Sequence, residues 1–294
     1  METISLARPT RPAIAALPLL IALLLGSGYI TSKIALAYAD PLTVILIQFA
    51  LAAVVLLFAA LVTKAPWPTR PSQWMHLAAT GLLIQALQFV GLYSALDQGL
   101  SAGVSVLILG LMPIFTALGA AFFGDKVSSR QWWSLALGLI GVALAIAATV
   151  HTAGGSLLGY QAAAFALIGI TAGALYQRRF SADADLRTGG FIQLISATAV
   201  MLPLAYLYEG LQMNPTLGLY ISSGWLSLIN SIGLIALLST LAGRNKSGQI
   251  AGGFYLIPIA TAVLGIVVLH ESWSPIAIVG FGVAAAAMYL CTKR

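Results

Sequence analysis

The chain has 294 residues, of which 60% are hydrophobic and only 7% are charged, and its formal net charge is +6. A soluble domain usually carries about 25% charged residues, so this composition excludes an ordinary soluble protein and indicates a membrane protein. The positive charge needs no nucleic-acid partner to explain it, because Lys and Arg collect in the short cytoplasmic loops of membrane proteins.

Apolar segments follow one another along almost the whole chain. A helix needs about 20 mostly apolar residues to cross the hydrocarbon layer of a bilayer. Most of the joints between the segments contain Gly, Pro, Asn or Asp, which end helices. The predicted spans cover residues 14–36, 42–62, 75–96, 103–123, 132–150, 157–176, 189–208, 219–240, 249–269 and 275–291.

The distribution of basic residues predicts the orientation. If Arg8 is cytoplasmic and the spans alternate, thirteen of the 14 Lys and Arg residues lie on the cytoplasmic side, and only Lys33 lies outside. This asymmetry is typical of multi-pass membrane proteins. We therefore expect both termini in the cytoplasm, with residues 1–13 as an N-terminal tail.

The second half of the chain repeats the first. A shift of 145 residues pairs Gln48 with Gln193, Gln85 with Asn230, Leu92 with Leu237, Gly103 with Gly248, and Pro113 with Pro258. Five spans is an odd number, so the second copy enters the membrane from the opposite side. We therefore predict an all-α membrane protein with ten transmembrane helices, arranged as two inverted five-helix repeats (14–150 and 151–294) around a central cavity. Secondary transporters with alternating access follow this plan.

Uncharged polar side chains lie at mid-depth in the predicted spans. Gln85 and Gln88 are one turn apart on the third span, with Phe89 beside them, and Asn230 with Ser231 occupies the matching part of the eighth. Lipid offers no hydrogen bonds, so these groups must face a cavity or another helix. Amides donate to a carboxylate and accept from an ammonium, which suits a zwitterion. Helix–helix adhesion is the alternative.

Two prolines lie near the middle of the fourth and ninth spans. Pro113 and Pro258 each lack the N–H of a helix interior, which frees a carbonyl and favours a kink. Gly110 lies three residues before Pro113, and Tyr255 three residues before Pro258. We expect these four residues to line or gate the cavity; a kink buried in helix packing is the alternative.

The first span contains a short polar stretch. Gly26 and Gly28 interrupt an aliphatic run and are expected to act as a flexible break, and Tyr29 follows as a candidate for the cavity wall. Close helix packing is the other use of small residues in membrane helices.

The sequence lacks the patterns expected of an enzyme or an ion-coupled pump. No Asp, Glu, Lys, Arg or His lies at mid-depth in the ten predicted spans, whereas a proton-coupled carrier usually has a titrating group there. Ser101 lies in a Gly-x-Ser-x-Gly pattern but between two helices, so we interpret it as a helix cap and not as a nucleophile. We expect no catalytic residue, no metal and no cofactor.

Several motifs resemble those of a known family, the EamA type of the drug/metabolite transporter (DMT) superfamily. They are Gly26-Ser27-Gly28 in the first span, Gly124-Asp125-Lys126 after the fourth-span proline, and Leu137-Gly138-Leu139-Ile140-Gly141-Val142. The chain looks most like bacterial exporters of aromatic amino acids. The resemblance implies a multi-pass protein of the bacterial inner (plasma) membrane that exports Phe, Tyr, Trp and related metabolites. It also implies a ten-helix basket whose cavity is lined by helices one, three, four, six, eight and nine.

The sequence departs from that family in two places. His270-Glu271 stands where many relatives have Gly-Glu, and Gln48 lies near a position where many relatives have a basic residue. We still expect a monomeric, alternating-access exporter that takes an amino acid from the cytoplasm. Its polar end would bind Gln85, Gln88 and Asn230, with the ring against Phe89, Tyr29 and Tyr255. A drug or other metabolite carrier of the same superfamily and a passive channel are the alternatives.

Overall fold

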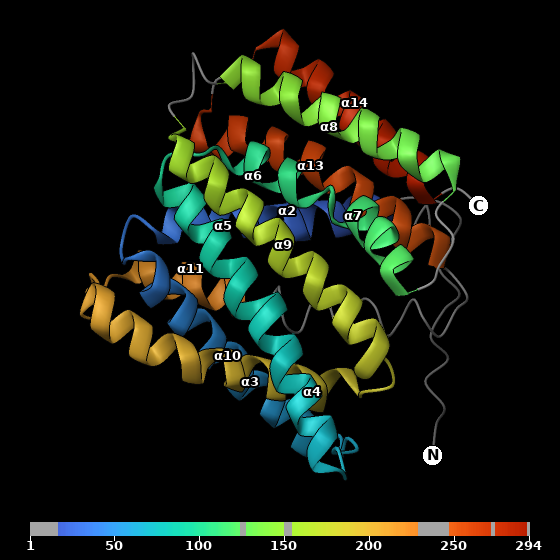
Figure 1. Ribbon diagram of the computed structural model, residues 1–294. Coiled ribbons are helices and arrows are strands. Elements are labelled where there is room, and N and C mark those ends of the chain that lie inside the picture. The colour runs from blue at the N-terminus through green and yellow to red at the C-terminus, as the bar shows by residue number, and fades with distance from the viewer. Residues whose placement is uncertain (1–16, 124–127, 150–154, 229–246, 272–273, 293–294) are drawn as a thin grey trace, which may run out of the picture.

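The structure, a computed structural model, describes residues 17–123, 128–149, 155–228, 247–271 and 274–292. Within these ranges every regular element is a helix, and the single described β-bridge is an isolated one between Ala39 and Met213 (Figure 1). The predicted all-α class is therefore confirmed. In chain order the elements are α2 (Leu17–Ala35), α3 (Pro41–Val62), α4 (Pro71–Gly81), η1 (Leu82–Leu87), α5 (Gln88–Asp97), α6 (Ala102–Leu109), α7 (Met112–Gly119), η2 (Ala120–Phe123), α8 (Ser129–Thr149), α9 (Leu157–Phe180), α10 (Leu186–Glu209), α11 (Leu217–Ser227), α13 (Ser247–Leu269) and α14 (Pro275–Thr292).

Most of these helices have the length and composition of membrane spans. Among the described residues, 6 helices are long and apolar enough to cross a bilayer, when α4–η1–α5 and α6–α7 are each taken as one. Shorter apolar helices lie within α2, α13 and α14. The start of the predicted eighth span is α11, and residues 229–240 of that span lie outside the described residues. The ten-helix inverted repeat thus stays a prediction.

Helix ends follow the local chemistry of the chain. Pro41 begins α3, where its missing N–H costs nothing. The hydroxyl of Ser101 accepts a hydrogen bond from the N–H of Val104, so Ser101 caps α6 as expected. Gly210 ends α10 with a φ of 64°, a left-handed conformation that glycine adopts without strain.

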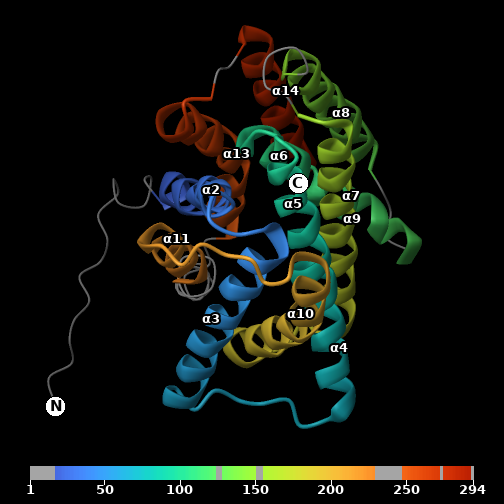
Figure 2. The same ribbon diagram turned by 90° about the vertical axis from the view of Figure 1, so that its left-hand side faces the viewer.

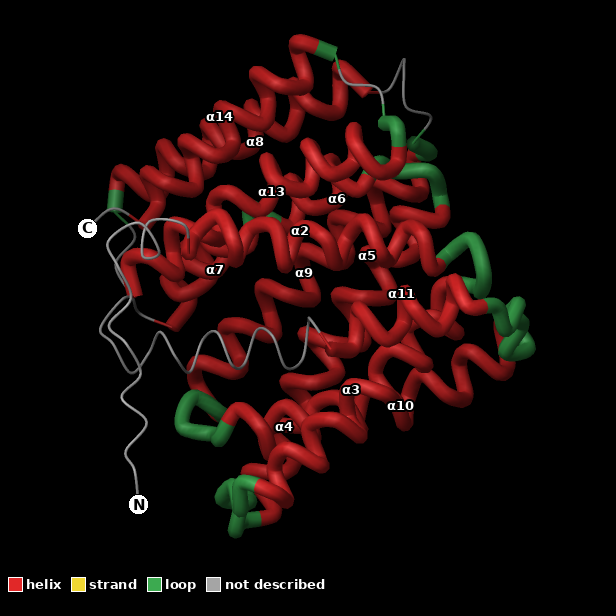
Figure 3. The backbone as a smooth tube through the Cα atoms, turned by 180° about the vertical axis from the view of Figure 1, so that it is seen from behind, coloured by secondary structure: helices red, strands yellow, loops and turns green. Residues whose placement is uncertain are grey.

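Helices from the two halves of the chain interlock. The largest contacts pair α14 with α8, α13 with α2, α10 with α3, and α9 with α5. In Figure 1, α8 and α14 lie at one edge of the molecule and α3 and α10 near the other, and Figure 2 shows the same order from the side. Viewed from behind in Figure 3, short connections join the helix ends. Residues 14–150 and 151–294 therefore do not form separate lobes.

Glycines permit the close approach of α8 and α14. A Cβ added to Gly141 would lie 2.7 Å from the carbonyl oxygen of Gly280, and a Cβ on Gly280 would lie 2.6 Å from the carbonyl oxygen of Gly141. Any side chain at either position would push the two backbones apart, as expected of small-residue seams in membrane helices.

The third span is not a regular α-helix. Residues Leu82–Leu87 form a π turn, in which the N–H of Gln88 reaches the carbonyl of Leu83, five residues back. The expected simple one-turn spacing of Gln85 and Gln88 is therefore replaced by a wider turn. The neighbouring α9 accommodates it with Gly169, where an added Cβ would lie 2.9 Å from the N of Gln88.

The fourth and ninth spans, each predicted to kink at a central proline, differ. The fourth span breaks at Gly110–Leu111, between α6 and α7, and Pro113 lies in the first turn of α7. The kink expected at this position is therefore present. By contrast, α13 runs from Ser247 to Leu269 and contains Pro258 without interruption.

The break expected in the first span is absent, which corrects that prediction. The helix α2 is continuous through Gly26 and Gly28. A Cβ on Gly26 would lie 2.9 Å from Oγ1 of Thr261 on α13, so this glycine serves the close packing of α2 on α13. Gly26 therefore allows close helix contact in place of a bend.

Candidate functional site

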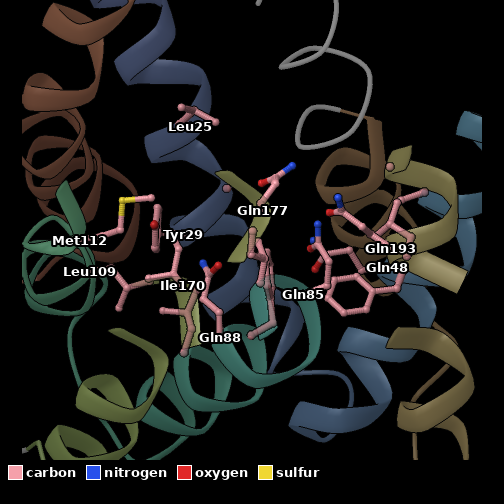
Figure 4. A pocket seen from close by; sticks show the side chains of 18 of the residues that line it. Leu25, Tyr29, Gln48, Gln85, Gln88, Leu109, Met112, Ile170, Gln177 and Gln193 are labelled. Carbon is pink, nitrogen blue, oxygen red and sulfur yellow. The ribbon is translucent and has the colours of Figure 1, made fainter. Parts of the chain in front are cut away.

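A central cavity of about 490 Å³ lies between helices from both halves of the chain (Figure 4). Its described walls come from α2, α3, η1, α5, α6, α7, α9, α10, α13 and α14. The volume falls within the roughly 300–1,000 Å³ typical of small-molecule sites. The cavity is thus large enough for an amino acid or another small metabolite.

Many of the predicted site residues line this cavity. They are Tyr29, Gln85, Gln88 and Phe89 among the binding candidates, and Gly28, Gly110, Pro113 and Pro258 among the gating candidates. Gly26 instead packs against α13. Asn230 and Ser231 lie outside the described residues, and for Tyr255 only the backbone, in α13, is described.

Glutamine side chains form most of the polar part of the cavity. Figure 4 labels Gln48, Gln85, Gln88, Gln177 and Gln193 along its wall. Asp185 is the one charged residue among the described lining residues, and it lies at the beginning of α10. At mid-depth the described wall therefore offers both donors and acceptors without net charge.

The rest of the wall is apolar. Leu25, Leu109, Met112 and Ile170 line the cavity away from the group formed by Gln48, Gln85 and Gln193 in Figure 4. Phe89 extends an aromatic surface from the polar group, because its ring meets that of Phe49 edge-on at 5.2 Å between centroids. The site is therefore amphipathic: Gln48, Gln85 and Gln193 form a polar group on one side, and the aliphatic side chains lie on the other, together with Tyr29 and Gln88.

Gln48 ends a buried hydrogen-bond chain behind the cavity. The Ser32 hydroxyl lies 2.8 Å from the carbonyl oxygen of Gly28 and 2.9 Å from the Tyr93 oxygen. The Tyr93 hydroxyl in turn donates to Oε1 of Gln48. Ser32, Tyr93 and Gln48 are all buried, Tyr93 completely, so the chain is shielded from competing water.

Sequence reasoning did not select Gln48 or Gln193 as site residues. Both had appeared as a matched pair in the internal repeat, and both line the cavity from the packed helices α3 and α10. A polar residue repeated at the same place in both halves was therefore a usable signal. Nothing in the sequence pattern pointed to Ser32 or Tyr93.

One end of the cavity reaches the molecular surface at the connection between α9 and α10. Gln177, Ala184 and Asp185 line it there. The Arg187 guanidinium donates to both carboxylate oxygens of Asp185, at 3.0 and 2.7 Å, and the Arg187 N–H donates to the same carboxylate at 2.9 Å. These hydrogen bonds hold the pKa of the Asp185 carboxyl below its usual value, so Asp185 is charged but already paired.

The opposite end, around Lys33 and Glu271, is closed by interactions between helix ends. Lys33 on α2 forms an ion pair with Glu271 after α13, at 2.8 Å, and the same carboxylate oxygen accepts from the N–H of Ala102 at the start of α6, at 3.2 Å. Glu209, at the end of α10, accepts from the N–H groups of Leu42 and Thr43 at the start of α3, both at 2.8 Å. Five helices are therefore tied together beyond this end of the cavity.

Comparisons with known proteins agree with this architecture. Residues 12–147 match the model of the EamA-like transporter family. The uncharacterized inner membrane transporter YedA of Escherichia coli is 29% identical over 275 residues, which cover 91% of this chain and 86% of the relative. A protein of Salmonella typhimurium named as a probable amino-acid metabolite efflux pump is 24% identical over 288 residues, covering 93% of both chains.

A solved crystal structure shares the fold. It superposes with a TM-score of 0.63 over 96% of this chain and 97% of the other, at 19% sequence identity, which is a likeness of fold alone. The family match and the relatives confirm the resemblance found in the sequence, and they are transporters and not enzymes. These findings together indicate a multi-pass inner-membrane transporter that is similar to the EamA type of the drug/metabolite transporter superfamily.

Proposed function

We propose that this transporter exports amino acids with apolar side chains, above all Phe, Tyr and Trp, by alternating access. The observation that carries the proposal is the amphipathic cavity, whose described mid-depth wall bears amides and no charged side chain. A zwitterion needs a donor for its carboxylate and an acceptor for its ammonium, and each amide supplies both. The relative named as an amino-acid metabolite efflux pump supports this substrate class.

The residues on the wall suggest how an amino acid binds. Gln85 and Gln88 bind its polar end, together with Asn230 and Ser231 of the predicted eighth span. Phe89 and Tyr29 contact the ring, because aromatic pairs prefer edge-on or offset contacts with centroids about 4.5–7 Å apart. Tyr255 of the predicted ninth span is the third residue proposed to contact the ring.

A substrate with phosphate groups fits this wall less well. Phosphates are usually bound by Arg and Lys side chains, and no basic side chain is found among the described lining residues. A nucleotide-sugar carrier is therefore disfavoured.

The arrangement of the helices supports alternating access in a monomer. The contact of α5 with α9 has a counterpart in that of α11 with α2, as an exchange of the two halves requires, and α2 with α13 corresponds to α9 with α6 and α7. One end of the cavity is open and the other is tied. With the orientation given by the basic residues, the open end faces the cytoplasm, where an exporter loads.

Counterflow in proteoliposomes tests the proposed function. Liposomes loaded with unlabelled Phe should take up labelled Phe transiently and saturably, and external Tyr or Trp should compete, whereas Thr and a nucleotide sugar should not. A pH gradient should leave the rate unchanged, because no titrating side chain is found on the described mid-depth wall. Absence of Phe movement would refute the proposal, and uptake without saturation or exchange would indicate a channel.

A paired variant connects this activity to the cavity. Gln85→Ala should raise the KM for Phe about tenfold, because a hydrogen bond to a charged group contributes about 1.5–3 kcal/mol. Gln212→Ala is the matched control, since Gln212 is exposed between α10 and α11. An unchanged KM in Gln85→Ala would remove Gln85 from the site.

A further inference from the structure

Gln48 presents its amide to the cavity in one orientation. Figure 4 shows its side chain at the wall beside Gln85 and Gln193. Its Oε1 is occupied by the hydroxyl proton of Tyr93, so the group left for a solute is the Nε2, with two N–H donors. A carboxylate can only accept hydrogen bonds, and it is the part of an amino acid that fits such a group.

We propose that Gln48 recognises the carboxylate of the transported solute, and that Ser32 and Tyr93 are positioning residues that keep its amide in the donating orientation. This inference rests on the proposed function of the cavity in amino-acid transport. It adds a residue with a defined chemical role to that function.

The hydrogen bonds run from Ser32 through Tyr93 to Gln48. Tyr93 has a single hydroxyl proton, which it donates to Gln48. The oxygen of Tyr93 is then left as the acceptor for Ser32, whose hydroxyl lies 2.9 Å away. A reversed Gln48 amide would be satisfied only if Tyr93 turned its proton toward Ser32 and Ser32 turned its own toward the carbonyl oxygen of Gly28, so the amide is coupled to both hydroxyls.

Burial makes it costly to reverse the Gln48 amide alone. Tyr93 is 0% exposed, Gln48 2% and Ser32 3%. A buried donor or acceptor left without a partner is strongly unfavourable. The backbone is held as well, because the Ser227 hydroxyl of α11 donates to the carbonyl oxygen of Gln48 at 3.0 Å. The amide is thus oriented before any solute arrives, which reduces the entropy lost on binding.

Gln193 can complete the carboxylate site. It lies on α10, which packs against α3, and it lines the same cavity. Its backbone is fixed by Gly81, because an added Cβ at Gly81 would collide with the carbonyl of Gln193. A carboxylate has two oxygens, so amide donors from both halves of the chain can bind one each.

Recognition by amides predicts a particular selectivity. The amide donors need an acceptor, which a carboxylate supplies and an amine without a carboxylate does not. They cannot neutralise a net negative charge, so the carboxylate must be balanced by the ammonium of the same molecule. The site therefore favours solutes that have a carboxylate and no net charge over amines that lack the carboxylate.

The test compares phenylalanine with 2-phenylethylamine, which lacks the carboxylate, as competitors of labelled Phe counterflow. With the native chain, phenylalanine should compete at about tenfold lower concentration. Gln48→Leu should remove that difference by weakening phenylalanine alone, and Tyr93→Phe should weaken phenylalanine severalfold with 2-phenylethylamine unchanged. Equal weakening of both competitors, or of neither, would overturn the inference.

Gln48→Glu provides a variant of nearly native size. It keeps an acceptor for the Tyr93 hydroxyl but replaces the amide donor with a negative oxygen. The preference should invert, with phenylalanine weakened and the cationic 2-phenylethylamine strengthened; retention of the native preference would refute the role of Gln48. If the native chain moves no Phe, the proposed function fails and takes this inference with it, whereas transport of Phe with unaltered selectivity in the variants refutes this inference alone.

Discussion

The two ends of the cavity use acidic residues in different ways. At the closed end, Glu271 and Glu209 reach from the ends of α13 and α10 to the starts of α6 and α3. At the open end, Asp185 pairs with Arg187, two residues further along the same chain segment. A local pair can remain formed whichever way the helices lean, whereas a pair that bridges helices must break when they separate. We infer that the ionic interactions of the closed end, and not those of the open end, control access.

The largest effect is expected from Glu271→Gln. The substitution leaves Lys33, whose side chain is 29% exposed, without the carboxylate that neutralises it. Loss of one partner from a partly buried pair costs about 2 kcal/mol, a population shift of about 30-fold toward opening of this end. The measurement is thiol labelling from outside the cell at Leu92→Cys, which lines the cavity, with Cys291, the only cysteine, replaced by Ala.

The control for this prediction is Asp97→Asn. Asp97 is an exposed acid at the same end of the molecule, at the last residue of α5. The labelling rate at Leu92→Cys in the Asp97→Asn variant should match that of the parent. Equal rates for Glu271→Gln and the parent would show that the ion pair does not hold this end closed.

A smaller effect is expected from Glu209→Gln. The Glu209 carboxylate accepts hydrogen bonds with both oxygens at the positive N-terminal end of α3, and an amide has only one such oxygen. The closed end should lose about 1 kcal/mol of stabilisation, and the thiol at Leu92→Cys should be labelled about fivefold faster. If Glu209→Gln were labelled faster than Glu271→Gln, the Glu209 contact would stabilise the closed end more than the Glu271 contact, which would contradict the predicted order.

The smallest effect is expected at the open end. Asp185→Asn removes a partly exposed ion pair near the surface but keeps a side chain that caps α10. The free energy of unfolding should therefore change by less than about 0.5 kcal/mol, and the rate of thiol labelling should not change. Because Arg187 lowers the pKa of Asp185, the stabilisation from this pair is present above the usual Asp value of about 4 and is lost only as the pH falls through the lowered pKa. The difference in Tm between parent and variant should therefore be equal at pH 7 and pH 5; a difference that disappears by pH 5 would contradict this.

Much of the fold was predictable because lipid imposes simple rules. Apolar length predicted the positions of the spans, and a missing backbone donor at Pro113 predicted the break between α6 and α7. The same reasoning did not distinguish Pro258, where α13 continues, because tertiary packing decides whether a freed carbonyl bends its helix. The Gly26–Gly28 stretch shows the same limit, since Gly26 packs against α13 and Gly28 lines the cavity within a continuous helix.

The candidate site was predictable only in part. Mid-depth position identified Gln85 and Gln88 as polar groups that need a partner, and the cavity receives both. The role of Tyr93 in orienting Gln48 depends on contacts between residues 45 positions apart, which no local pattern reports. Chemistry that arises from the meeting of distant helices requires coordinates.

The π turn at Leu82–Leu87 carries a consequence for motion. It stores one surplus residue inside a span that otherwise follows the 3.6-residue period. If the π turn moved along the span toward either terminus, the side chains that it passed, Gln85 among them, would turn by about 100° around the helix axis. The helix itself would remain continuous. A solute could thus be gripped or released by a screw-like rotation of one short segment, with the remainder of the scaffold standing still.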